Sequence, residues 1–268
     1  MLRLCCKWKA SKDAGVTLHS LILFCCLLAI NIFLQVTNGS YESDFGAHPD
    51  EGAHVVTALM IRDYLAGGFL ESINPLTYAE SYYESFPKVA IGHYPPLFYL
   101  ISGGWLLFGV SSGSLLIFSA VITSLCGLTT FLLGSLFMGR VWALGATLMF
   151  TVSPLTQRYT SVFMSDMMLL ALCLLSAAAF SRFMKSGGRV DSVFFGIVAS
   201  VAILTKSSGL LLAALPGVAL LLACRLHLLR APVIWIAPII VSLTSIPWFL
   251  LTYRITAEGA MGGGASAY

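Results

Sequence analysis

The sequence predicts an all-α polytopic membrane protein, and three observations lead to this class. First, 58% of the 268 residues are hydrophobic and only 10% are charged, whereas a soluble domain is nearer a quarter charged. Second, several apolar runs reach or approach the roughly 20 residues that a membrane-spanning helix needs. Third, these runs are continuously apolar, whereas strands of a membrane barrel alternate.

Eight apolar segments follow a short N-terminus, residues 1–15, which is expected in the cytoplasm because four basic residues precede the first segment. The segments lie at about residues 16–36, 95–110, 114–136, 141–153, 167–184, 192–205, 209–224 and 232–253. They define a predicted transmembrane module at 16–254. Residues 255–268 are expected to begin a further outer loop of a chain that continues.

Basic residues after the fifth and seventh segments predict the orientation. They are Arg182, Lys185, Arg189, Arg225 and Arg230. Such clusters favour the cytoplasmic side. Asp166 and Lys206 lie at the other ends of the segments that these clusters flank, so they are expected on the outer side. The loop of residues 37–94 is also expected there, because it follows the first segment. An even number of crossings must then separate that loop from Asp166, although three apolar segments lie between them. One segment therefore does not span alone, with 141–153 as the first candidate, and about seven crossings are expected.

The loop of residues 37–94 is too long for a simple connection, and loops of this length are usually functional. It carries eight of the twelve acidic residues of the chain. Within it, residues 50–65 predict an amphipathic helix, with Asp50 at its start and an apolar stripe that includes Val55 and Leu59. Such a helix can lie along the membrane surface.

Carboxylates from two separate loops are the main candidates for catalysis. Asp50 and Glu51 are adjacent at the start of the predicted helix, where acids also stabilise a helix merely by complementing its dipole. Asp166 is the only acidic residue between Glu84 and Asp191. An ionisable residue beside a membrane segment is by default a functional candidate, although a helix cap is again the alternative. Acids on one side of the membrane can share a substrate or a metal.

Further polar residues on the outer side are candidates for binding an anionic substrate. His93 and Tyr94 precede a Pro-Pro pair that fixes where the next helix begins. His54 follows Asp50 by four residues and shares its helix face. The candidate cations are Lys88, Arg158 and Lys206. Each cation alone fits a side chain that reaches the membrane surface, whereas together they suit a phosphate.

No strong cofactor motif is present. The HExxH and paired CxxC patterns of zinc sites are absent, as is a P-loop. A divalent cation, Mg or Mn, held by Asp50 and Asp166 is an open alternative, because oxygen ligands suit these ions. The sequence shows no basic face for nucleic acid. None of the seven cysteines lies in the acidic loop, so no disulfide framework is predicted.

Five short motifs, taken in order, resemble those of a known enzyme group. They are Asp50-Glu51, Tyr94-Pro95-Pro96-Leu97, Ser165-Asp166-Met167, Leu204-Thr205-Lys206 and Ile246-Pro247-Trp248. Over about residues 16–254 the chain resembles the GT-C membrane glycosyltransferases. It is most similar to the protein O-mannosyltransferase and aminoarabinose transferase group (glycosyltransferase families 39 and 83). These enzymes pass a sugar from a polyprenyl-phosphate carrier on the outer face to a lipid, glycan or protein acceptor.

The resemblance implies a GT-C module of about seven helices with a catalytic first outer loop. It also implies that Asp50 is the base and Asp166 the acid of the second loop. In some members a lysine precedes the Pro-Pro pair and contacts the lipid phosphate. This chain has Tyr94 there, which leaves His93, Lys88 or Arg158 as substitutes. Family members continue with further helices and often a soluble domain.

The predicted reaction is a single inverting displacement. Asp50 accepts the proton of the acceptor hydroxyl, and the lipid phosphate leaves, stabilised by Arg158, Lys206 or a metal. Two alternatives stay open. A transporter or flippase of a lipid-linked substrate needs polar residues at the middle of the membrane. A non-catalytic fragment would instead bind partner helices.

Overall fold

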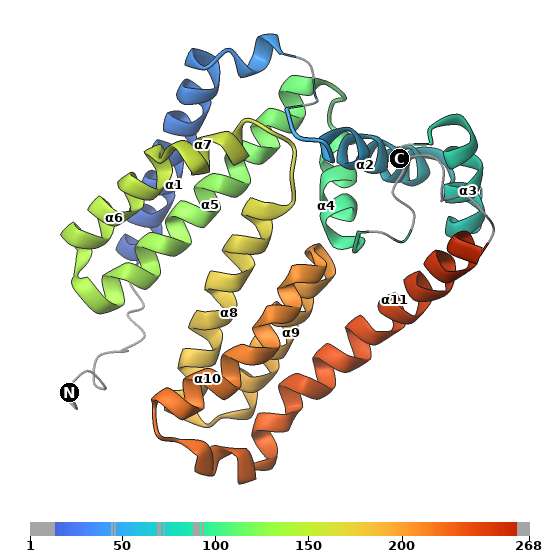
Figure 1. Ribbon diagram of the computed structural model, residues 1–268. Coiled ribbons are helices and arrows are strands. Elements are labelled where there is room, and N and C mark those ends of the chain that lie inside the picture. Colours follow the sequence, from blue (N-terminus) through green and yellow to red (C-terminus); the bar gives the residue numbers. More distant parts are fainter. Residues whose placement is uncertain are drawn as a thin grey trace.

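The computed structural model describes residues 14–43, 45, 47–68, 71, 73–87, 92 and 94–261, and all of their regular secondary structure is helical (Figure 1). The predicted all-α class is therefore confirmed. Four segments are long and apolar enough to cross a membrane, namely Leu18–Thr37, Ser112–Met138, Asp166–Ser186 and Pro232–Tyr253. The shorter apolar helices are Leu97–Leu106, Arg140–Val152 and Ser207–Leu222.

The first half of the helix layer is a bundle around one long helix, α5. Its members are α1 (Ala14–Thr37), α5 (Ser112–Met138), α6 (Arg140–Val152) and α7 (Pro154–Thr160). The chain reverses at Gly139, whose φ of 79° is rarely adopted by residues with a side chain, and α6 packs back along α5. Pro154 cannot continue the hydrogen bonding of α6. Beyond this break, α7 completes the return, and Thr160 bonds to Thr123 of α5.

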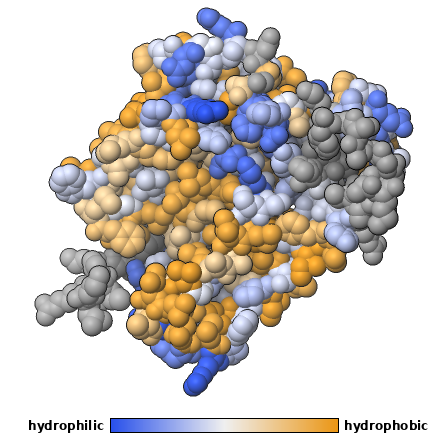
Figure 2. Space-filling model, in the orientation of Figure 1, coloured by the Kyte–Doolittle hydropathy of each residue, from blue (hydrophilic) through white to orange (hydrophobic). Residues whose placement is uncertain are grey.

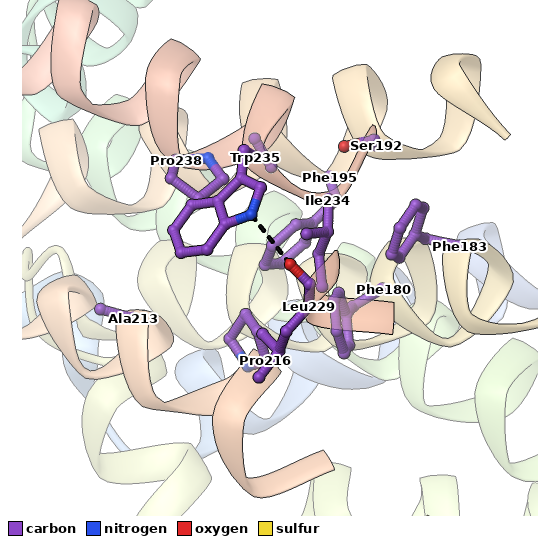
Figure 3. A pocket seen from close by; sticks show the side chains of 11 residues that line it. Phe180, Phe183, Ser192, Phe195, Ala213, Pro216, Leu229, Ile234, Trp235 and Pro238 are labelled. Atoms are coloured by element: carbon purple, nitrogen blue, oxygen red, sulfur yellow. Dashed lines mark hydrogen bonds between the residues drawn. The ribbon is translucent and has the colours of Figure 1, made fainter. Parts of the chain in front are cut away.

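The second half is built around α8 and α9, which run antiparallel. Its elements are α8 (Asp166–Ser186), α9 (Arg189–Thr205), η3 (Ser207–Ala213), α10 (Ala214–Leu222), η4 (Leu226–Arg230), η5 (Pro232–Trp235) and α11 (Ile236–Met261). Buried aromatic residues, Phe180, Phe183 and Phe195, form the centre of its core. They also line an apolar cavity of about 200 Å³. Trp235 lies at its edge and donates a hydrogen bond to the carbonyl of Leu229 (Figure 3).

The long first loop folds into helices at one end of the layer. They are η1 (Ser40–Glu42), α2 (Glu51–Asp63), the π-helical η2 (Tyr64–Gly68), α3 (Pro75–Ser85) and α4 (Leu97–Leu106). The amphipathic helix predicted at 50–65 is confirmed, with Asp50 as its N-cap. Its apolar side packs on α4, where Ala58 and Phe98 share a buried cluster. This side is therefore covered by protein.

Helix α4 is the apolar segment that stays at one end of the layer. Its 10 residues extend only about 15 Å, and it lies beside α2 (Figure 1). The segment 141–153, which was the first candidate not to span alone, forms the short helix α6. This helix continues into α7, and the two together run along α5. The helices that run along the layer are α1, α5, α6 with α7, α8, α9, η3 with α10, and α11.

The two ends of the helix layer carry different charges. The end with the acidic loop also holds Asp166 and Lys206, at the start of α8 and just after α9. At the other end, Arg182 pairs with Asp191, with 3.1 Å between Nη2 and Oδ1. Arg225 donates to a carbonyl of the same end of α8. Arg182 and Arg225, one from each basic cluster, therefore lie at the end opposite the acidic loop.

Buried amide side chains join α1 to the rest of the bundle. Asn31 and Gln35 of α1 are 0% exposed. Asn31 Nδ2 donates to Ser124 Oγ at 3.0 Å, and Gln157 Nε2 donates to Asn31 Oδ1 at 2.9 Å. Gln35 Nε2 donates to the carbonyl of Thr160 at 2.7 Å. Because unpaired amides are costly in an apolar layer, these bonds fix the end of α7, where the loop to Asp166 begins.

Large hydrophobic side chains cover the outside of the helix layer (Figure 2). Phe137, Trp142, Met149, Leu222 and Leu243 are between 71% and 83% exposed. Monomeric soluble proteins rarely expose apolar surface on this scale, whereas lipid tails cover it without penalty. The surface and the four long apolar helices are those of a membrane protein.

Candidate functional site

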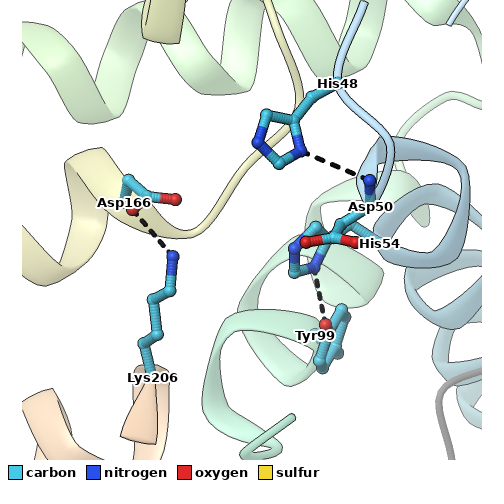
Figure 4. Close-up of polar contacts among 6 residues, drawn as sticks. All are labelled: His48, Asp50, His54, Tyr99, Asp166 and Lys206. Atoms are coloured by element: carbon cyan, nitrogen blue, oxygen red, sulfur yellow. Dashed lines mark hydrogen bonds and ion pairs between the residues drawn. The ribbon is translucent and has the colours of Figure 1, made fainter. Parts of the chain in front are cut away.

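An ion pair joins the start of α8 to the end of α9. Lys206 Nζ donates to Asp166 Oδ1 at 2.7 Å. Asp166 is the first residue of α8, where a carboxylate complements the helix dipole. The two side chains are partly buried, with 32% of Asp166 and 26% of Lys206 exposed. Figure 4 shows them beside the beginning of α2, from the first loop.

Asp50 presents an exposed carboxylate to this region. It occupies the N-cap position of α2 but makes no side-chain capping hydrogen bond. Its backbone N–H donates to Nδ1 of His48 at 3.3 Å. Figure 4 shows the Asp50 carboxylate beside the ring of His54. A capping role for α2 therefore does not explain why an aspartate side chain stands at position 50.

Glu51 has different surroundings, because it links the two loops. Its side chain is 2% exposed. Oε1 accepts the N–H of Phe163 at 2.7 Å, and Oε2 accepts the N–H of Ala47 at 3.1 Å. Phe163 lies three residues before Asp166 in the loop between α7 and α8. Hydrogen bonds to a carboxylate are strong, so Glu51 is placed to position that loop, whereas the sequence grouped it with the catalytic acids.

His54 lies one helical turn after Asp50 and is 1% exposed. Its Nδ1 is 2.6 Å from the hydroxyl of Tyr99, and its ring centroid is 4.6 Å from that of Tyr94. Burial and, next, the charge of Lys206 lower the pKa of His54 to about 4, against smaller opposing effects of Asp50 and Asp166. The ring is thus neutral at pH 7, and these charges lie close enough to act on it.

Six of the residues predicted from the sequence come together at this end. They are Asp50, Glu51, His54, Tyr94, Asp166 and Lys206. Arg158 is exposed on α7 and makes no ion pair within the described part of the chain. Lys88 and His93 lie outside the described residues.

One further residue at the site, Tyr99, was not singled out from the sequence. Tyr99 did give a signal, because it is a tyrosine within the apolar segment 95–110, and a buried tyrosine hydroxyl usually finds a partner.

The carboxylates of Asp50 and Asp166 do not fit a metal centre built by the protein alone. Lys206 already neutralises Asp166, and a second positive charge there would be repelled. Within the described ranges, no three His, Cys, Asp or Glu side chains converge as metal ligands.

The lowered pKa of His54 predicts a pH-dependent stability. Below about pH 6.5 the unfolded chain protonates this histidine, whereas the folded protein does so only near pH 4. The stabilisation is fully present above that window and is lost as the pH falls through it, by about 3 kcal/mol in total. Thermal unfolding at about pH 7 and about pH 4.5 should differ less for His54→Phe than for the unchanged protein. Equal pH dependence in both would contradict the burial effect.

Comparison with known proteins identifies one family. The sequence model of the dolichyl-phosphate-mannose-protein mannosyltransferase family matches residues 93–250. The match includes Asp166 and Lys206 and begins after Asp50, Glu51 and His54. No curated protein and no solved structure matches the chain. Because the match covers more than half of the 268 residues, the chain belongs to the dolichyl-phosphate-mannose-protein mannosyltransferase family and is a membrane glycosyltransferase of the GT-C type.

Proposed function

We propose that the chain transfers a sugar from a polyprenyl-phosphate-linked donor to an acceptor hydroxyl on the outer or luminal face of the membrane, with inversion at the sugar carbon. One observation carries the proposal. The exposed carboxylate of Asp50 lies near an ion pair, Asp166 with Lys206, that comes from two other elements. A base for the hydroxyl and a cation for the phosphate are the groups that this displacement needs.

Asp50 acts as the base in this mechanism. The carboxylate accepts the proton of the acceptor hydroxyl while the oxygen attacks the sugar carbon, and the bond from that carbon to the lipid phosphate breaks. Attack from the side opposite the phosphate inverts the configuration. The exposure of Asp50 supports this role, because an acceptor must reach the base from outside the protein.

Lys206 binds the lipid phosphate in this mechanism. The leaving phosphate gains negative charge, and a nearby ammonium group stabilises it. Lys206 directly follows Thr205, the last residue of α9, and an apolar helix ends where the phosphate of an embedded lipid also lies. Asp166 holds the ammonium in place at 2.7 Å.

Removal of the Lys206 charge is expected to weaken donor binding. Because a hydrogen bond to a charged partner contributes about 1.5–3 kcal/mol, Lys206→Met should reduce the affinity for polyprenyl phosphate by about tenfold to 100-fold. Binding to the purified protein in lipid nanodiscs measures this. Lys185→Met removes an exposed lysine at the other end of α8 and serves as the control. Unchanged affinity in Lys206→Met would contradict the phosphate contact.

A transfer assay tests the proposed reaction itself. Membranes that contain the full-length protein are incubated with polyprenyl phosphates carrying radiolabelled mannose, glucose or arabinose. We expect label to leave one of these donors and appear in a second product. Label that stays on every donor would contradict sugar transfer.

A further inference from the structure

Two buried polar atoms at the site have no hydrogen-bond partner among the described residues. They are Nε2 of His54 and Oδ2 of Asp166. Folded proteins pair nearly all of their buried polar atoms with protein, water or ligand. In Figure 4 the unbonded nitrogen of His54 faces Asp166 and Lys206, and the unbonded oxygen of Asp166 faces the side of α2. These two atoms are therefore candidates for contact with one ligand.

The tautomer of His54 determines which role Nε2 plays. A neutral imidazole carries one proton, on either nitrogen. The Tyr99 hydroxyl lies 2.6 Å from Nδ1; when the proton is on Nε2, this hydroxyl donates to Nδ1. The negative charges of Asp50 and Asp166 act on the ring and favour an N–H on the side that faces them. Nε2 is then a donor, whereas Oδ2 of Asp166 is an acceptor.

We propose that His54 Nε2 and Asp166 Oδ2 together bind a ring hydroxyl of the donor sugar. A hydroxyl accepts one hydrogen bond and donates another, so a single group satisfies both atoms. The inference rests on the proposed function. If the lipid phosphate binds Lys206, the sugar attached to it lies next to Asp166, the ion-pair partner of Lys206.

Other ligands suit the two atoms less well. A phosphate offers acceptor oxygens and negative charge, which the carboxylate of Asp166 repels. A cation would meet the N–H of His54 and the ammonium of Lys206. A water molecule has the right donors and acceptors, but it cannot make binding depend on whether the lipid carries a sugar. Sugar-dependent affinity therefore distinguishes a hydroxyl site from a structural water.

His54→Phe tests the inference, because it keeps an aromatic ring and removes the donor. The affinities of undecaprenyl phosphate carrying mannose, glucose or no sugar are measured for the full chain in nanodiscs. Loss of one hydrogen bond to a buried group should weaken the preferred sugar lipid about tenfold and leave the sugar-free lipid within about twofold. Tyr99→Phe removes the hydroxyl that contacts Nδ1 and should reduce affinity in the same selective way, by a smaller factor.

His227→Phe is the matched control, since His227 is exposed in η4 at the opposite end and its replacement should change neither affinity. Three results would each overturn the hydroxyl site. His54→Phe could leave all affinities unchanged, or it could weaken lipids with and without sugar equally. The unmodified protein could also bind both sugar lipids no more tightly than the sugar-free lipid. Lys206→Met separates this inference from the proposed function. Weaker binding of all three lipids in Lys206→Met supports the phosphate site even where His54→Phe has no selective effect.

Discussion

Asp50→Asn is expected to reduce sugar transfer by about 100-fold to 10,000-fold, the usual contribution of a positioned general base. The amide has nearly the shape of the carboxylate but cannot accept the proton of the acceptor hydroxyl. Because the Asp50 side chain is exposed and makes no capping hydrogen bond, folding and donor binding should be preserved. The initial rate of label transfer at saturating donor measures the effect, and thermal unfolding checks the fold.

Glu80→Gln provides the control for this change. Glu80 is an exposed acid on α3, in the same loop, and loss of its charge should leave the rate within about twofold of the unmodified protein, as is usual for surface changes. Transfer by Asp50→Asn at the rate of the Glu80→Gln protein would contradict the role of Asp50 as base.

Glu51→Ala is expected to reduce both stability and transfer. It leaves the N–H groups of Phe163 and Ala47 without their acceptor. The N–H of Phe163 belongs to a residue that is 0% exposed, and leaving such a group unsatisfied costs about 1–3 kcal/mol, so the free energy of unfolding should fall by about 2 kcal/mol. The loop that carries Asp166 also loses its connection to the first loop, and a displacement of about 1 Å can reduce a rate about 100-fold. Thermal unfolding and the transfer assay measure the two effects.

Glu51→Gln separates positioning from catalysis. Glutamine keeps the shape of the side chain and one acceptor oxygen for the N–H of Phe163, so a positioning role predicts partial recovery of both stability and transfer relative to Glu51→Ala. A Glu51→Gln protein that unfolds like the unmodified one and yet transfers no sugar would assign Glu51 to the chemistry instead.

The helical membrane fold was predictable because its signals are local. Continuous apolar runs identified the segments that became α5 and α8, and the apolar stripe after Asp50 identified α2. The partner of α2 was not predictable, since its apolar side meets Phe98 of α4, a contact between separate segments. Hydropathy also could not show that α4, within 95–110, stays at one end, or that α6 continues into α7 along α5, because composition does not reveal how segments pack.

The site was predictable only where a residue is conspicuous in its own neighbourhood. Asp166 and Lys206 stand out because each is a charge between apolar runs. Asp50 and Glu51 are adjacent and chemically alike, so the sequence could not assign them different roles. The contact of Glu51 with Phe163, 112 residues away, separates them. The pairing of His54 with Tyr99, 45 residues apart, was hidden for the same reason, because sequence spacing does not encode contacts between loops.

The side of the membrane on which both loops open is the most direct test of a single outer-face site. Ala47→Cys and Ser208→Cys each introduce a single cysteine into a protein without native cysteines, at exposed positions near Glu51 and Lys206. Each protein is treated with an impermeant maleimide in sealed vesicles of known orientation. We expect both to react from the outer or luminal side, and Lys185→Cys to react only from the cytoplasmic side. Reaction of Ala47→Cys and Ser208→Cys from opposite sides, or of both from the cytoplasmic side, would contradict the site proposed for this enzyme.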